Sequence, residues 1–285
     1  MNPYRTGFVG ATTNDATQWV AEQVGNAKRI CVPFTGTGKD IASMAGPGRV
    51  IESWDTLFYS RAIIEGVFSE RAPVAMSNVD QVRYTKGWMY ETRAMKNIDE
   101  RSAGFIDWVA ANGTLFDKAC MTSATIRSTL LGRGNQWYAN IEQFWNRFCK
   151  AREYNVQWLD RPGTFTHHEG SFFDSIPTRR YDLIQVDPPK VVVGTDVYSA
   201  NFQALNKMFG GAVDPLPKWS WRDVMARFRQ IVEIDAERMI FLYVSGVRPD
   251  YSDVRKMLLE HFDEEASKAF SHKGRTDYGL VLRRK

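Results

Sequence analysis

The sequence predicts an α/β protein built on a doubly wound, mostly parallel sheet. Residues 29–55 follow the order strand, glycine turn, helix, strand, acid, which opens a nucleotide-binding sheet. A second apolar run, residues 181–186, indicates a buried strand. Pro188 and Pro189 end this strand because proline fixes φ and has no N–H to donate. Asp187 is therefore expected at a strand's carboxyl end, where ligands of open α/β sheets bind.

Composition is typical of a globular protein: the 285 residues are 44% hydrophobic and 25% charged. The three cysteines, Cys31, Cys120 and Cys149, are too widely spaced for a zinc motif or a disulfide framework. The N-terminal residues lack the apolar core of a signal peptide. The longest apolar run, residues 239–244, is too short to cross a bilayer. These features predict a cytoplasmic protein without a membrane partner.

The remaining elements follow from apolar periodicity and turn residues. We expect a helix over 12–23 capped by Thr13 or Asn14, and a helix over 220–236 opened by Ser220 and Asp223. The other expected strands are 29–34, 49–54, 164–168 and 238–245, and the other expected helices are 39–44, 57–68 and 251–260. Residues 266–282 predict a C-terminal β-hairpin turning at Lys273-Gly274, with Arg283, Arg284 and Lys285 as a solvated tail.

Residues 76–150 interrupt the alternation of strands and helices after Pro73. Between residues 80 and 152 there are eleven Lys/Arg and seven Asp/Glu, so the chain's net charge of +4 lies in this segment. Aromatic residues are interleaved with these cations, a composition that suits phosphate contacts and base stacking. The alternative is that the rings form the core of a helical subdomain, and most of them are expected to do so. Arg133 and Asn135 lie in a Gly-Arg-Gly-Asn loop, where exposure for contact is expected.

The glycine turn over residues 33–39 has two interpretations. A phosphate-binding Walker loop requires a first glycine and a final hydroxyl, but this chain has Pro33 and Asp40 at those positions. The other interpretation is a turn in which Gly36 and Gly38 let a cofactor approach the backbone, while Asp55 holds its ribose. The later Asp-Pro-Pro motif favours this second interpretation.

These motifs together resemble a known family. Pro33-Phe34-x-Gly36-x-Gly38, Trp54-Asp55 and Asp187-Pro188-Pro189 are similar to the signature motifs of Dam-like DNA adenine methyltransferases. The resemblance implies S-adenosylmethionine as cofactor and DNA as partner. The biological role stays open between restriction–modification, phage defence and housekeeping methylation. It also implies a Rossmann-like methyltransferase domain formed by residues 1–75 and 151–285, with a mainly helical target-recognition subdomain over 76–150.

The resemblance also assigns roles to single residues. Pro33, Phe34, Gly36, Gly38 and Asp55 would form the cofactor site, joined by Phe172. Asp187, with Pro188 and Pro189, would orient the target amino group, and Arg133, Asn135 and Tyr198 would contact DNA. No metal is expected, because adjacent residues such as His167 and His168 point to opposite faces of a strand.

Two positions depart from the family pattern. Lys190 stands where an aromatic residue usually stacks on the target base, and Ser171 where an acid usually contacts the cofactor's adenine, with Glu169 and Asp174 nearby. Three readings of Lys190 remain open. Tyr198 or Phe202 supplies the stack, or the substrate is an unusual base or anionic group, or methyl transfer has been lost and the chain is a binding protein.

Overall fold

The computed structural model describes residues 13–69, 81–92, 98–130, 140–156, 158, 161–188, 204–209, 221–272 and 275–285. The first elements are α1 (Asn14–Gln23), β1 (Arg29–Val32), α2 (Lys39–Met44), β2 (Val50–Asp55), α3 (Phe58–Ile63) and the π-helical turn η1 (Ile64–Ser69). The middle elements are α4 (Trp88–Thr92), α5 (Glu100–Asn112), α6 (Leu115–Leu130) and α7 (Ile141–Val156). The last are β3 (Thr164–Glu169), the 3₁₀ turn η3 (Phe172–Asp174), β4 (Tyr181–Val186), α9 (Trp221–Val232), β5 (Ala236–Val244), α10 (Tyr251–His261), β6 (Phe262–His272) and β7 (Arg275–Arg284).

The strands form one seven-stranded sheet in the order β3-β2-β1-β4-β5-β7-β6. Strands β3, β2, β1, β4 and β5 are parallel, and β7 runs antiparallel to both of its neighbours. The strand order reverses between β1 and β4, which pair directly. The sheet is therefore the predicted Rossmann-like α/β sheet with a C-terminal β-hairpin.

Most predicted elements are confirmed, including α1 with Thr13 as its N-cap: the Thr13 Oγ1 accepts the N–H of Ala16 at 3.2 Å. Several boundaries differ by one or two residues, and the helix predicted over 57–68 is α3 followed by η1. Two boundaries differ by more. Helix α9 ends at Val232, before the predicted residue 236, because Ala236 already pairs with Tyr181 as the first residue of β5. The hairpin is longer than predicted, since its pairing extends from Phe262 to Arg284.

Two hydrophobic cores cover the two faces of the sheet. One contains Ile30 of β1, Leu183 of β4 and the buried side of α1 and α2. The other contains Ile184 of β4 and Phe228 of α9, together with α10. The alternation of Leu183 and Ile184 between the two cores is the two-residue period of a strand buried on both faces.

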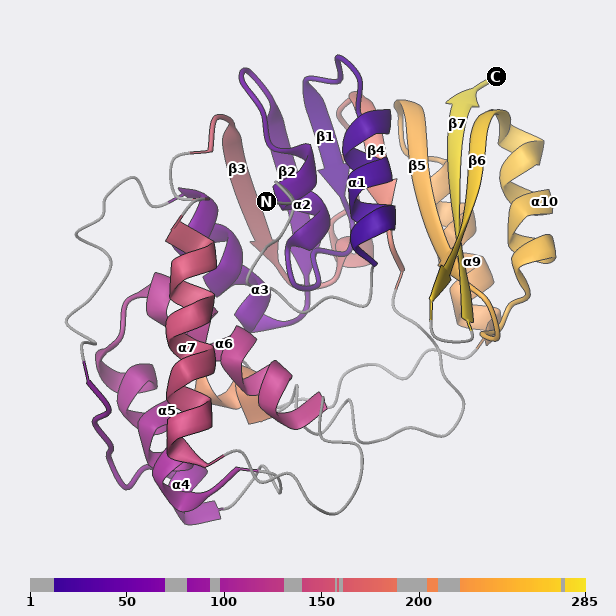
Figure 1. Cartoon of the computed structure of the whole chain (residues 1–285). Helices are drawn as coiled ribbons and strands as arrows, with labels where there is room; N and C mark the ends of the chain where they lie inside the picture. Colours follow the sequence, from indigo (N-terminus) through magenta and orange to yellow (C-terminus); the bar gives the residue numbers. More distant parts are fainter. Residues whose placement is uncertain are drawn as a thin grey trace.

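Helices α4–α7 lie beyond the end of the sheet toward which the arrowhead of β3 points (Figure 1). Their aromatic residues largely form a core, as expected: Phe105, Phe144 and Phe148 are fully buried, and Phe105 packs edge-on against Phe148 at 5.4 Å. This core is continuous with the sheet residues of the first core. At Gly66 in η1, an added Cβ would lie 2.5 Å from the backbone of Leu115, so η1 and α6 are in direct backbone contact.

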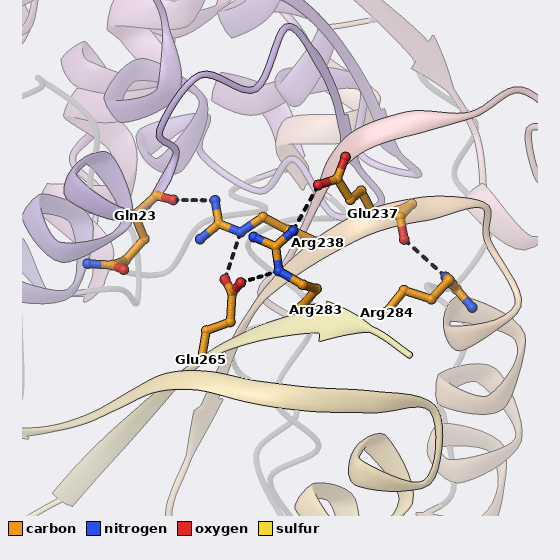
Figure 2. Close-up of polar contacts among 7 residues, drawn as sticks. Gln23, Glu237, Arg238, Glu265, Arg283 and Arg284 are labelled. Carbon is orange, nitrogen blue, oxygen red and sulfur yellow. Dashed lines mark hydrogen bonds and ion pairs between the residues drawn. The ribbon is translucent and has the colours of Figure 1, made fainter.

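The expected solvated tail was wrong. Arg283 and Arg284 belong to β7, and both make specific polar contacts (Figure 2). Glu265 accepts bonds from both Arg238 and Arg283, and Arg283 also pairs with Glu237 at 3.0 Å. The apolar alternation of the tail predicted its strand, but nothing in the local sequence shows that carboxylates on β5 and β6 lie within reach.

Arg284 satisfies carbonyl groups where α9 turns into β5. Its guanidinium donates to Val232 O at 2.8 Å, to Ala236 O at 3.0 Å and to Ile234 O. The last carbonyls of a helix have no partner within the helix, so these bonds stabilise the turn that ends α9.

We expect Arg284→Ala to lower the free energy of unfolding by about 2 kcal/mol, because hydrogen bonds from a charged donor to buried carbonyls are lost. Arg255→Ala provides a matched control, since it removes a half-exposed arginine that pairs with Glu264 at 2.8 Å. Its cost should stay below about 1 kcal/mol. Urea titration measures both, and equal costs would contradict the capping role.

Candidate functional site

The candidate site lies where the strand order reverses. In an open α/β sheet the connections after the two strands at the reversal diverge to opposite faces, and ligands bind at the carboxyl ends of those strands. Here the two strands are β1 and β4, paired in parallel with Ile30 opposite Leu183 and Cys31 opposite Ile184. Continuing this register places Phe34 opposite Asp187. The glycine turn and the Asp-Pro-Pro motif therefore begin at the same edge of the sheet.

The glycine turn requires both of its glycines. Gly36 and Gly38 have φ of +52° and +69°, a conformation that L side chains rarely adopt. A Cβ on Gly38 would lie 2.9 Å from Ile63, so helix α3 packs directly on this residue. A Cβ on Gly36 would meet no atom of the described residues within 4 Å. Gly36 therefore leaves open space next to the backbone, as the close approach of a ligand demands.

Asp55, at the end of β2, binds the glycine turn itself. Its Oδ2 accepts the Gly36 N–H at 2.7 Å, and its Oδ1 accepts the Leu57 N–H at 2.9 Å. Ser60 supports the same turn by donating to the Gly36 carbonyl at 2.7 Å. Burial raises the pKa of Asp55 to about 6, although the two backbone bonds favour its charged form. The sequence predicted a ribose-binding role for Asp55 but gave no sign that it would shape the turn.

A polar group joins α2 to β4 behind this edge. The buried Gln185 of β4 donates to Asp40 Oδ2 at 3.1 Å. Lys39, the first residue of α2, is 8% exposed. Burial lowers the pKa of Lys39, and the carboxylates of Asp40 and Asp187 oppose this shift. Lys39 therefore lies within electrostatic range of Asp187, and the two predicted motifs lie at the same edge of the sheet.

Sequence reasoning missed Lys39 and Gln185 as members of the site. A signal was present in each case: a lysine directly after the second glycine, and a glutamine inside an apolar strand. Asp40 was considered only as a departure from the Walker pattern. Its bond to Gln185 now assigns that carboxylate to the contact between α2 and the sheet.

Aromatic rings pack beside the carboxyl edge of the sheet, on the sheet face that α9 covers. Phe34 contacts Phe173 with ring centroids 6.0 Å apart, and Phe172 meets Trp54 edge-on at 5.2 Å. Phe172 is 2% exposed, so its ring belongs to the second core. Pro33 is likewise buried, directly after β1.

The structure places Pro33, Phe34, Gly36, Gly38, Asp55, Phe172, Asp187 and Pro188 near the carboxyl edge of the sheet. Pro189, Lys190, Arg133, Asn135 and Tyr198 lie outside the described residues, as does Phe202. Their assignments remain predictions.

The adjacent histidines of β3 have separate partners. His167 Nδ1 lies 3.1 Å from Ser53 Oγ, and His168 stacks on Trp54 with centroids 4.5 Å apart. Burial, and then the neighbouring His168, lowers the pKa of His167 to about 4. Among the described residues, no group of three or more His, Cys, Asp or Glu side chains is arranged to hold a metal ion. None of the described helices is long and apolar enough to span a membrane.

Comparisons with known proteins gave only distant structural likenesses. No family model matches the chain, and no curated protein matches its sequence. Magnesium protoporphyrin IX methyltransferase (ChlM) from Synechocystis PCC 6803 with bound SAM aligns with a TM-score of 0.42 and 9% identity, over 95% of this chain and 77% of that one. P. horikoshii TYW2 in complex with MeSAdo aligns with a TM-score of 0.37 and 8% identity, over 97% of this chain and 64% of that one. The METTL16 MTase domain aligns with a TM-score of 0.36 and 8% identity, over 94% of this chain and 80% of that one. Likenesses this distant carry no argument about substrate.

We expect Asp55 to make stability depend on pH. Its pKa is higher in the folded chain, about 6, than the ordinary 3.8, so the folded state binds the proton more tightly. The resulting stabilisation is fully present below pH 3.8 and is lost as the pH rises through 6, by about 3 kcal/mol. In Asp55→Asn this loss should disappear.

Urea titrations of wild type and Asp55→Asn at pH 4, 5, 6 and 7 measure the effect. His167 contributes with the opposite sign, because its pKa is lowered. Only the difference between the two proteins at each pH therefore reports on Asp55. A difference that stays constant across this range would contradict the raised pKa.

Proposed function

We propose that the chain is an S-adenosylmethionine-dependent methyltransferase that acts on the exocyclic amino group of adenine in DNA. The observation that carries this proposal is the meeting of the glycine turn and Asp187 at the carboxyl edge between β1 and β4. A donor and an acceptor of a methyl group must lie within contact distance, and this arrangement provides a site for each.

The residues of the glycine turn fit the cofactor. Gly36 leaves open space beside the backbone, and Asp55, at the end of the next strand, is the acid that such folds use to bind a ribose. S-adenosylmethionine bound there would supply an electrophilic methyl group. Phe34 would flank it from the side of the second core.

Asp187 and Pro188 would prepare the amino group for reaction. An exocyclic amino nitrogen is a weak nucleophile because its lone pair is conjugated with the base. The Asp187 carboxylate and the Pro188 carbonyl would each accept one N–H, which localises the lone pair on nitrogen. The target base must first leave the duplex, and unstacking costs a few kcal/mol.

Lys190 supports a second candidate, a protein of the same fold that binds DNA or a protein partner without catalysis. An ammonium group has no π face, and a cation near a nitrogen that gains positive charge would slow methyl transfer. A related enzyme that modifies an unusual base would also be consistent with a cation at this position.

We expect Asp187→Ala to lower the rate of methyl transfer to DNA at least about a hundredfold, because the amino group loses a charged acceptor in the transition state. Mass spectrometry of nucleosides from treated DNA measures N6-methyldeoxyadenosine. Asp263→Ala, at an exposed position of β6, is the control and should keep wild-type activity. Wild-type protein that binds DNA but transfers no methyl group would favour the non-catalytic candidate, and activity that survives in Asp187→Ala would refute the site.

We expect Gly36→Ala to weaken S-adenosylmethionine binding at least about tenfold, because the added methyl group fills the open space beside the turn. It should also cost roughly 1–2 kcal/mol of stability, since alanine disfavours positive φ. Gly48→Ala is a matched control: Gly48 has φ of +66°, and among the described residues an added Cβ would meet only the flexible end of Lys28, at 3.6 Å. Calorimetry should show a similar stability loss in both variants but an affinity loss in Gly36→Ala alone.

A further inference from the structure

Three cations lie over aromatic rings around α4, in and beside the stretch 83–90. The Arg83 guanidinium lies 5.5 Å from the ring centroid of Trp108, the Lys86 ammonium 5.6 Å from that of Tyr90, and the Lys207 ammonium 4.3 Å from that of Trp88. The three cations are exposed, whereas the three rings are half-buried against the first core. A cation over the face of a ring is attracted to it, which restricts where the charged group lies.

The backbone that carries these side chains is fixed against α5. The Thr85 N–H donates to the Gly104 carbonyl at 3.0 Å. Asp107 accepts the N–H groups of Gly87, Met89 and Tyr90 at 2.9 to 3.2 Å. Positions 83–90 therefore form a surface that is preorganised, which lowers the entropy lost when a partner binds.

Part of the negative charge of this helical segment is engaged in hydrogen bonds within it. Asp107 is 7% exposed and Asp117 is fully buried. Asp99 caps α5 and accepts the N–H groups of Ser102 and Ile141. Three of the seven carboxylates between residues 80 and 152 are thus bonded within the segment, while Arg83 and Lys86 face the solvent. Such a surface attracts a polyanion.

Tyr84 adds an aromatic face to these cations. Its side chain is 58% exposed, next to Arg83 and packed at its base against Gly104. An exposed ring beside cations suits the stacking of an unpaired base, which tolerates any base because each has a π face.

Lys207 connects this surface to the Asp-Pro-Pro side of the molecule. It belongs to the segment 204–209, which follows Asp187 within the same strand-to-helix connection. Ala204, Leu205 and Phe209 anchor this segment in the first core, and Lys207 reaches Trp88 of α4. The described part of this connection, residues 204–209, is therefore in contact with α4.

We propose that the exposed groups of Arg83, Tyr84, Lys86 and Lys207, here called the α4 surface, bind the DNA substrate. The three cations contact backbone phosphates flanking the target base, and Tyr84 stacks on a base that base flipping leaves unpaired. This inference rests on the proposed function, to which it adds the surface that holds the substrate. Because phosphate contacts carry no sequence information, the α4 surface sets affinity and position, and sequence is read elsewhere.

The test compares wild type with the triple variant Arg83→Ala/Lys86→Ala/Lys207→Ala, which leaves the rings of Trp88, Tyr90 and Trp108 packed against the first core. Fluorescence anisotropy with a labelled 20-base-pair duplex is measured at several salt concentrations. We expect binding to weaken at least about thirtyfold near 0.1 M salt, and the slope of log affinity against log salt to fall by about 2–3, close to one per phosphate contact. Tyr84→Ala should weaken binding about tenfold to a duplex that carries an unpaired base, and Tyr84→Phe should bind like wild type.

The control variant is Arg229→Ala/Lys256→Ala/Lys268→Ala. All three residues are exposed, they lie on α9, α10 and β6, and Lys268 also lies over a ring, 5.5 Å from Phe270. Its affinity and salt slope should fall by much less. Equal losses of DNA affinity in the two triple variants would overturn the proposed role of the α4 surface, because general charge attraction would then explain binding. So would unchanged binding in the first variant, or stronger competition by an RNA duplex or an acidic peptide than by DNA.

Failure of this inference can be distinguished from failure of the proposed function. If the α4 surface is wrong but the function is right, wild type and the first triple variant methylate DNA with the same KM. If the function is wrong, wild type transfers no methyl group. Calorimetry with S-adenosylmethionine should give the same affinity for all of these variants, which shows that the cofactor site is intact.

Discussion

The direct parallel pairing of β1 with β4 is the constraint on which the rest of the molecule depends. It places two stretches that are about 150 residues apart in the sequence at one edge of the sheet. The strand order reverses there, and the helices that follow the two strands, α2 and α9, pack on different faces of the sheet. The glycine turn, Asp55 and Asp187 acquire a common site only through this pairing. Within it, the carboxylate of Asp55 fixes the turn by holding Gly36 and Leu57.

The sequence predicted the sheet well, because its signals are local. Apolar runs closed by turn residues indicated the strands, and Pro188 marked the end of β4. The glycine pattern predicted a turn over residues 33–39, and the structure has a turn there in which Gly36 and Gly38 adopt positive φ. These features depend on residues that are neighbours in the chain, so a single sequence contains the information needed to find them.

Contacts that join distant elements could not be predicted in this way. Arg284 looked like part of a solvated tail, but its partners are carbonyls about 50 residues earlier, at the turn after α9. The electrostatic coupling of Lys39 with Asp187 and the bond from Gln185 to Asp40 likewise exist only once β1 and β4 are paired. Asp55 shows the intermediate case: its place at a strand end was predictable, whereas the backbone groups that it binds were not.

The backbone contact between Gly66 and Leu115 limits how the helical segment can be exchanged. With a Cβ there only 2.5 Å from Leu115, this contact tolerates no side chain, and the core around Phe105 runs without a break into the sheet. Helices α4–α7 therefore do not form a unit that can be replaced independently of the sheet. In a chimera that carries the corresponding helices of another protein on this sheet, the helices would pack poorly against the sheet. Good packing would require that η1 and the segment 204–209 be transferred together with the helices.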